Sequence, residues 1–189
     1  MFIGMNLYPN TRGSAARNPD KIVRVATHLK CLQILSDTIH PVYGVEHGMG
    51  NSSTPWFHGM NLEVLLSYED DPRWRVCNPC KNTHVIVPYE GIDEFVEKVG
   101  TTIPDLQKTV CLVDGPGPQR IDVLVALIRL GAPGVVFHDA ETLTSEEVAR
   151  IKDVEKETGY FIRQHIGMNP ETLLCSKTVL ELGSDFVEF

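Results

Sequence analysis

A glycine-rich turn preceded by an acid is the first segment whose residues could bind a ligand. Glu46, Gly48 and Gly50 occur in Glu46-His47-Gly48-Met49-Gly50, at the end of an apolar segment, 41–46, and before a short helical stretch. A Gly-x-Gly turn in this setting lets the backbone approach a ligand closely, and the following helix offers free N–H groups. The alternative is that the two glycines only make a tight turn.

Glu69 makes this turn more informative. It follows a second apolar segment, 62–68, about 20 residues after the glycines, where an acid can accept both ribose hydroxyls of a nucleoside. The alternative is a solvated strand end. Ser53 stands where a dinucleotide site has a third glycine, and no P-loop Lys-Ser or Lys-Thr pair follows the turn, so neither of those sites is favoured.

Further polar side chains follow two other apolar segments. Asp114 comes directly after the segment 109–113. His138 is the last residue of the segment 134–138, and Asp139 follows it. Carboxyl ends of parallel strands meet at one edge of an open α/β sheet, so we expect these residues to lie together. Asp114 and Asp139 could hold a divalent cation such as Mg²⁺, or His138 or Asp139 could act as a general base. In the alternative, Asp139 caps a loop and His138 is a core residue.

Arg120 is a candidate substrate ligand. It lies at the start of a predicted helix, after the stiff loop Asp114-Gly115-Pro116-Gly117-Pro118, where its charge opposes the helix dipole. That position suggests that Arg120 binds a carboxylate or phosphate group of a substrate. An arginine simply paired with a nearby acid is the alternative.

Cysteine usage indicates free thiols. The five cysteines are an odd number, which fits a reducing compartment, and we expect Cys31, Cys111 and Cys175 to be core residues. Cys77 and Cys80 form a Cys-x-x-Cys pair near His84. A structural zinc site would need a fourth ligand from His40, His47 or His58, so two ordinary thiols are the favoured interpretation.

The elements needed to position these residues alternate between strands and helices. Strands are predicted over 41–46, 62–68, 83–87, 109–113, 134–138, 160–165 and 173–179. Four helices are predicted. The first starts after the N-cap Asn18, and the second runs from Ile92 to a stop at Gly100. The third covers Ile121 to Ile128 and stops at Gly131, and the fourth begins at the capping box Thr144–Glu147. This alternation predicts a mostly parallel sheet covered on both faces, in which the last strand runs antiparallel after a short link.

Length and composition fit one soluble domain. The 189 residues divide into a predicted flexible arm, 1–18, and a single domain, 19–189. A net charge of −8 argues against a protein that holds nucleic acid by its phosphates. The apolar runs are too short for a membrane span and no signal pattern opens the chain, so we expect a cytoplasmic protein.

These segments together resemble the class I S-adenosylmethionine (SAM)-dependent methyltransferases. Residues 45–54 are similar to the first motif of that family, 66–74 to its acidic second motif, 110–116 to its fourth strand and 134–139 to its fifth. The resemblance covers about residues 42–180. It implies a three-layer Rossmann-like fold with a seven-stranded, mostly parallel sheet whose last strand is antiparallel.

The resemblance also implies a role for each matching residue. Glu46 would lie near the ammonium of the methyl donor, directly or through water, and Gly48 and Gly50 would line its methionine and ribose. Ser52 or Ser53 could bind the carboxylate, Glu69 the ribose and Asp70 the adenine edge. Tyr89, Glu90 and Asp114 complete the expected pocket, although Tyr89 could instead be a packed strand-end aromatic. Some O-methyltransferases of this fold bind Mg²⁺ at the two strand ends, but Ala140 departs from their pattern.

We therefore expect a SAM-dependent methyltransferase that O-methylates a small molecule or saccharide, with Asp114, Asp139 and His138 as catalytic candidates and a homodimer as one assembly. Two alternatives are open. One is a non-catalytic binding or assembly module that keeps the fold, because the chain has few insertions for substrate recognition. The other is a nicotinamide-dependent oxidoreductase.

Overall fold

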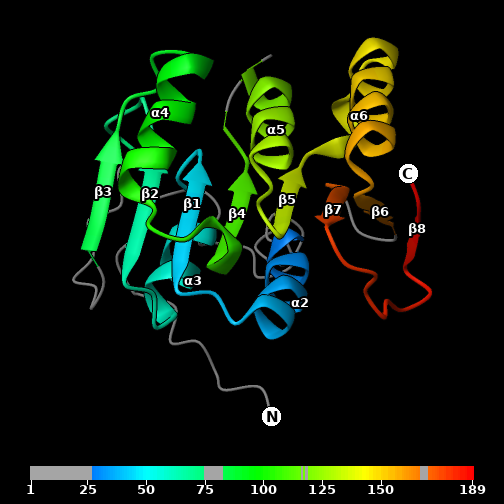
Figure 1. Ribbon diagram of the computed structural model, residues 1–189, viewed down its shortest axis with the longest axis horizontal. Helices are drawn as coiled ribbons and strands as arrows, with labels where there is room; N and C mark the ends of the chain where they lie inside the picture. Colours follow the sequence, from blue (N-terminus) through cyan, green and yellow to red (C-terminus); the bar gives the residue numbers. More distant parts are fainter. Residues whose placement is uncertain (1–26, 75–82, 116, 118, 167–169) are drawn as a thin grey trace, which may run out of the picture.

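The computed structural model has one mixed sheet between two layers of helices (Figure 1). It describes residues 27–74, 83–115, 117, 119–166 and 170–189. The strands are β1 (Tyr43–His47), β2 (Val64–Tyr68), β3 (Thr83–Val87), β4 (Thr109–Val113), β5 (Gly134–His138), β6 (Phe161–His165), β7 (Thr172–Ser176) and β8 (Phe186–Glu188). The helices are α2 (His28–Ile39), α3 (Ser53–Gly59), α4 (Ile92–Thr102), α5 (Gln119–Leu130) and α6 (Ser145–Thr158), with short 3₁₀ turns at Leu106–Lys108 and Ala140–Thr142.

The strand order is β3-β2-β1-β4-β5-β7-β6-β8. Strands β1 to β5 pair in parallel, whereas β7 is antiparallel to both β5 and β6. This confirms the predicted parallel sheet with a reversed strand after a short link. The order changes direction between β1 and β4, so the carboxyl ends of these strands face a topological switch point, where open α/β sheets bind ligands.

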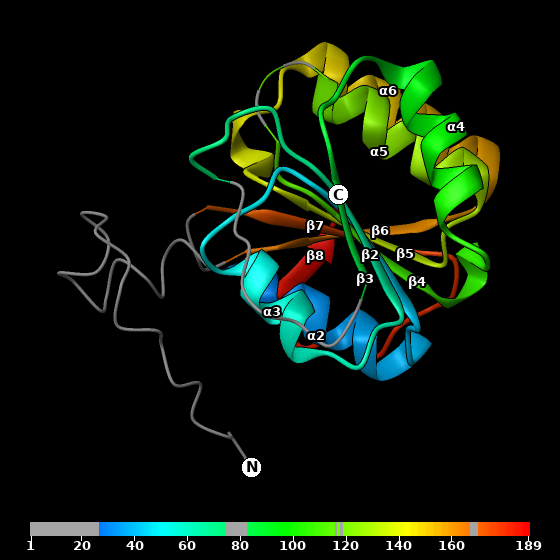
Figure 2. The ribbon, with the colours of Figure 1, turned by 90° about the vertical axis from the view of Figure 1, so that its left-hand side faces the viewer.

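Helices cover both faces of the sheet (Figure 2). Helices α4, α5 and α6 lie on one face, and α2 and α3 lie on the other. Each layer has its own apolar core: Phe95, Leu124 and Ile151 belong to the first, and Leu32 and Phe57 to the second. The five residues of β4 are all buried because this strand is central and covered on both sides, which is why its sequence is continuously apolar.

Several details differ from the sequence prediction. Strands β1 and β2 begin at Tyr43 and Val64, two residues later than predicted, and β1 includes His47. The sheet has an eighth strand, because β8 adds to β6 in antiparallel register. Strand β7 ends at Ser176 rather than Val179, which is 73% exposed. Helix α4 continues through Gly100 to Thr102; it ends where Ile103 becomes extended in front of Pro104, since a residue that precedes proline disfavours the helical conformation.

Other local predictions are confirmed. The Thr144 hydroxyl accepts a hydrogen bond from the Glu147 N–H, and the Glu147 carboxylate accepts one from the Thr144 N–H, so the capping box opens α6. Cys31, Cys111 and Cys175 are buried free thiols. The predicted arm, the N-cap Asn18 and the Cys77/Cys80 pair lie outside the described residues.

Candidate functional site

The glycine turn lies against the end of β4. Gly48 follows β1 with φ +90°, a conformation that favours glycine, and its N–H donates to the Tyr68 carbonyl at 2.9 Å. A Cβ on Gly48 would lie 2.4 Å from both Cα and N of Gly115. A Cβ on Gly115 would in turn lie 2.3 Å from a ring carbon of His47. The ends of β1 and β4 therefore meet with no room for side chains at either glycine.

Glu69 joins the end of β2 to this turn. Its carboxylate accepts hydrogen bonds from the Met49 N–H at 3.1 Å and the Asp71 N–H at 2.8 Å, and the residue is 7% exposed. The structure thus brings together the glycine motif and the acid that sequence reasoning paired with it. Asp70 accepts from the Tyr89 N–H at 2.8 Å, which ties the end of β2 to the segment that follows β3.

Glu46 lies beneath the turn and is fully buried. Its carboxylate accepts hydrogen bonds from the Thr54 hydroxyl at 2.9 and 3.0 Å and from the Ser67 hydroxyl at 3.0 Å. Burial raises the pKa of Glu46 to about 7, and the hydrogen bonds from neighbouring hydroxyls oppose that rise. The Thr54 hydroxyl also accepts a hydrogen bond from the Gly50 N–H at 3.1 Å. Thr54 therefore links the buried Glu46 carboxylate to the glycine turn, and Glu46 itself is not exposed to a pocket.

The other predicted donor ligands surround the same turn. Ser52 precedes α3 and Ser53, buried, is its first residue. Tyr89 is half-buried, with its ring centroid 5.1 Å from that of His47, and Glu90 is exposed. The ring of Tyr89 also lies near those of Tyr68 and Phe95, so the packed interpretation of this residue is confirmed, and a contact with adenine stays a prediction.

A hollow of about 270 Å³ beside the turn is lined by Asn51, Arg73 and Trp74. Trp74 is 45% exposed, and Arg73 forms an ion pair with Asp71, which follows the Glu69-Asp70 pair. Sequence reasoning assigned no role to Arg73 or Trp74. An aromatic residue a few positions after the acidic segment Glu69–Asp71 was the sequence signal that could have identified this wall.

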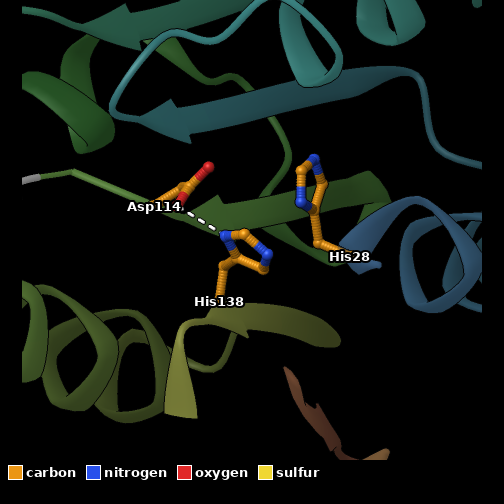
Figure 3. A group of neighbouring side chains, drawn as sticks. All are labelled: His28, Asp114 and His138. Atoms are coloured by element: carbon orange, nitrogen blue, oxygen red, sulfur yellow. Dashed lines mark hydrogen bonds and ion pairs between the residues drawn. The ribbon is translucent and has the colours of Figure 1, made fainter. Parts of the chain in front are cut away.

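A second group of polar side chains lies at the ends of β4 and β5 (Figure 3). The Asp114 carboxylate accepts a hydrogen bond from His138 Nδ1 at 2.8 Å; a carboxylate can only accept, so Nδ1 carries the proton. His138 Nε2 lies 3.2 Å from the Thr27 hydroxyl, which itself donates to the Pro170 carbonyl. Burial lowers the pKa of His138, but the hydrogen bond to Asp114 and nearby negative charge outweigh it, so the pKa lies above its ordinary value.

His28 completes this group and was not singled out by sequence reasoning. Its ring packs edge-on against that of His138, with centroids 4.5 Å apart. The nearest ligand atoms of His28, Asp114 and His138 all lie within 4.8 Å of one another. We call these three residues the strand-end cluster. A histidine in the first turn of a helix carries no sequence signal that links it to strands more than 80 residues away.

Asp139 and Arg120 lie at the edge of the cluster. Arg120 Nη1 donates to the His138 carbonyl at 3.2 Å and lies 3.5 Å from the Asp139 carboxylate, while Nη2 donates to Thr142 at 3.0 Å. Arg120 is thus an arginine paired with a nearby acid, as the second interpretation expected. The predicted oxygen-only Mg²⁺ set gains no support, because Asp114 is bound to His138 and Asp139 faces Arg120.

A chain of hydrogen bonds leads from Glu46 toward α3. Ser67 donates to Glu46 and lies 2.9 Å from His84 Nε2, and His84 Nδ1 lies 3.0 Å from His58 Nε2. Since Ser67 gives its proton to the carboxylate, His84 Nε2–H must donate to Ser67, and His58 Nε2–H to His84. His58 and His84, two of the predicted partners of the cysteine pair, therefore lie together.

Comparison with known proteins identifies the fold. No protein-family profile and no curated sequence matches the chain. Among solved structures it is similar to magnesium protoporphyrin IX methyltransferase from Synechocystis with bound SAM (TM-score 0.53, 12% identity, 92% of this chain and 88% of that one). It is also similar to the N-methyltransferase NodS from Bradyrhizobium japonicum in complex with S-adenosylhomocysteine (TM-score 0.52, 15% identity, 89% and 92%).

The chain therefore has the class I SAM-dependent methyltransferase fold, as the sequence motifs indicated. A precorrin 8w decarboxylase from Methanobacterium thermoautotrophicum is similar at the same level (TM-score 0.51, 13% identity, 80% and 90%). The fold alone does not specify the reaction, which must be argued from the site. Within the described residues, no helix is long and apolar enough to cross a membrane.

Proposed function

We propose that this protein is a SAM-dependent methyltransferase whose acceptor is a hydroxyl group of a small molecule or saccharide. The observation that carries the proposal is the closed arrangement of the glycine turn, in which Gly48 packs on Gly115 while Glu69 holds the Met49 N–H. The similar structures solved with SAM or S-adenosylhomocysteine support a nucleoside donor for this fold.

The residues around the turn fit such a donor. Glu69 would bind the ribose hydroxyls, Asp70 the adenine edge, and Gly48 and Gly50 leave space for the methionine part. Ser52 or Ser53 would bind the carboxylate, with Tyr89 and Glu90 beside the adenine. The hollow lined by Asn51, Arg73 and Trp74 adds a wall on which a base can stack. Glu46 is buried and hydrogen-bonded to Thr54, so it would act on the donor's ammonium group through water or through the turn that it supports.

The strand-end residues fit the acceptor. Asp114 follows β4 and precedes Gly115, so it lies between the glycine turn and His138. An acceptor hydroxyl that reaches this edge would give its proton to the carboxylate of Asp114 or Asp139. Its oxygen would then attack the sulfonium methyl carbon, and the C–S electron pair would pass to sulfur, which leaves neutral S-adenosylhomocysteine. The protein's main contribution is to hold the two reactants at attack distance.

Arg120 is not assigned to the substrate in this proposal. Its guanidinium is already engaged by the His138 carbonyl, Asp139 and Thr142, so it positions the end of β5.

Transfer of a labelled methyl group tests the proposal. The full chain would be incubated with methyl-labelled SAM and a panel of phenols, catechols, monosaccharides and disaccharides, with metal-supplemented and metal-free arms. We expect labelled ether product and S-adenosylhomocysteine in equal amounts with at least one class of acceptor. Tight SAM binding without transfer to any acceptor of this panel would instead support the non-catalytic module.

A further inference from the structure

The strand-end cluster, His28, Asp114 and His138, combines two imidazoles and one carboxylate from three separate elements. His28 begins α2, Asp114 follows β4, and His138 ends β5 (Figure 3). Within the described part of the chain, this is the one group of at least three histidine, cysteine or acidic side chains whose ligand atoms all lie within 4.8 Å. The elements that carry it belong to the rigid sheet and to the helix packed on β4 and β5.

His28 is the unusual member of this cluster. It is 2% exposed, and neither of its ring nitrogens has a hydrogen-bond partner among the described residues. Buried polar nitrogens are nearly always hydrogen-bonded, so an unpaired one needs an explanation. Figure 3 shows one ring nitrogen facing Asp114 and His138. A neutral imidazole has one ring nitrogen with a free lone pair, which can bind a metal ion.

We propose that His28, Asp114 and His138 bind a divalent transition-metal ion of the Zn²⁺ type and leave a coordination position open. Two nitrogen ligands and one carboxylate suit Zn²⁺, Fe²⁺ or Co²⁺, whereas Mg²⁺ prefers oxygen ligands and retained water. Three protein ligands with an open position are typical of catalytic rather than structural metal sites. The site differs from the oxygen-only pair Asp114/Asp139, because its second and third ligands are imidazoles.

The geometry requires only small movements. Ligand atoms around an ion with bonds of about 2.1 Å lie about 3 to 3.5 Å apart. His138 Nδ1 and Asp114 are already 2.8 Å apart with a proton between them, and a metal ion would replace that proton. The imidazole of His28 would move inward by about one ångström, where an ion would satisfy a nitrogen that now has no partner among the described residues.

The role of this ion rests on the proposed function. An ion held by these three residues would lie near the end of β4, because Asp114 follows that strand, and an acceptor hydroxyl could bind it there. A coordinated hydroxyl is more acidic than a free one, so its proton can leave to water or to Asp139, which lies 3.5 Å from His138 Nδ1. The resulting oxygen attacks the methyl carbon of SAM with the same balance of atoms and electrons as above.

Calorimetric titration with Zn²⁺ tests the site without any methyl acceptor. The full chain, stripped with a chelator, should bind one Zn²⁺ at the cluster, and Mg²⁺ should not compete at millimolar concentration. His28→Gln should weaken that binding at least about 100-fold. His84→Gln is the matched control, since His84 lies within hydrogen-bond distance of another histidine, the partly buried His58, but is outside the cluster. Unchanged Zn²⁺ binding in His28→Gln, or a loss confined to His84→Gln, would overturn the proposal.

Absorption spectroscopy with Co²⁺ covers the case in which His28→Gln does not fold. The wild-type protein should give visible d–d bands without the intense near-ultraviolet charge-transfer band of a cobalt–thiolate bond. A thiolate band would place the metal on cysteine and contradict the assignment. S-adenosylhomocysteine titration of His28→Gln separates the two proposals. Retained nucleoside binding with lost Zn²⁺ binding supports the metal site, whereas Zn²⁺ binding without nucleoside binding refutes only the proposed function.

Discussion

The backbone of Gly48 lies directly against the backbone of Gly115, so that a Cβ on Gly48 would come within 2.4 Å of Gly115 Cα and N. Gly48 belongs to the turn after β1 and Gly115 to the loop after β4. This contact brings the proposed donor turn next to Asp114. The same close approach that shapes the donor site therefore also sets the position of the acceptor residues.

Gly48→Ala should disrupt both stability and donor binding. The substitution puts a Cβ into the Gly115 backbone and forces alanine to φ +90°, which costs about 1–3 kcal/mol for the conformation alone. Urea denaturation measures the loss. Gly100→Ala is the control: it lies within α4 and its Cβ would meet nothing within 4 Å, so it should stabilise by about 0.5–1 kcal/mol. Equal stability of wild type and Gly48→Ala would show that the contact is not real.

Glu46→Gln should change how stability depends on pH. The folded-state pKa is about 7 and the ordinary value is 4.5, so between these pH values the unfolded chain loses a proton that the folded chain keeps. Wild-type stability therefore falls as pH rises through this window, and the loss is complete above pH 7. Glutamine has no such proton, so its stability relative to wild type should improve by a few kilocalories per mole between pH 5 and pH 8.

Denaturant midpoints at the two pH values measure this difference. Thr54→Val, which removes a hydrogen-bond donor to the Glu46 carboxylate, should extend the sensitive range to higher pH. A Glu46→Gln variant that keeps the same stability difference from wild type at pH 5 and pH 8 would show that Glu46 is not protonated in the folded protein.

Asp114→Asn should separate transfer from donor binding. The amide cannot hold the His138 proton as the carboxylate does and is a poor metal ligand, so methyl transfer should fall at least about 100-fold. SAM affinity should change by no more than about threefold, because Glu69 and the glycine turn remain. Arg129→Ala, on the far end of α5, should keep full activity. Turnover equal to wild type in Asp114→Asn would exclude this residue from the reaction.

Thr144→Ala should remove the capping box that opens α6. The hydroxyl satisfies the Glu147 N–H, and its loss should cost about 1 kcal/mol, which lowers the melting temperature by about 2–4 °C in a chain of this size. Glu146→Ala, in the same first turn but outside the box, serves as the comparison. A melting temperature unchanged by Thr144→Ala would mean that α6 is held by packing alone.

The sheet could be predicted from sequence wherever burial dictates composition. Strands β4 and β5 match their predicted bounds because all their residues are buried, and an apolar run between turn residues has no other place in a small domain. Strand β3 also matches, although it is only partly buried at the sheet edge, because four of its five residues are β-branched. Strand β8 was missed because its three residues are partly exposed at the sheet edge and carry no apolar run. The predicted stop at Gly100 was wrong because an exposed glycine can be tolerated within a helix that ends for another reason, here Pro104.

The candidate site could be predicted only where its residues follow strands. Glu69, Asp114, His138 and Asp139 were identified in this way, and the parallel topology brings them to one edge. His28 could not be identified from the sequence, because its place in the cluster depends on how α2 packs across β4 and β5. Pairings such as His138 with Asp114, or Arg120 with Asp139, likewise depend on rotamers that spacing does not encode.

The most direct test of the central claim is calorimetric titration of the full chain with SAM, repeated with Glu69→Ala. Glu69→Ala should weaken micromolar binding by at least about 10-fold, because a charged hydrogen bond contributes about 1.5–3 kcal/mol. Glu63→Ala, an exposed acid before β2 at the opposite end of that strand, should bind as wild type. No binding by the folded protein, or equal binding by Glu69→Ala, would contradict the donor site.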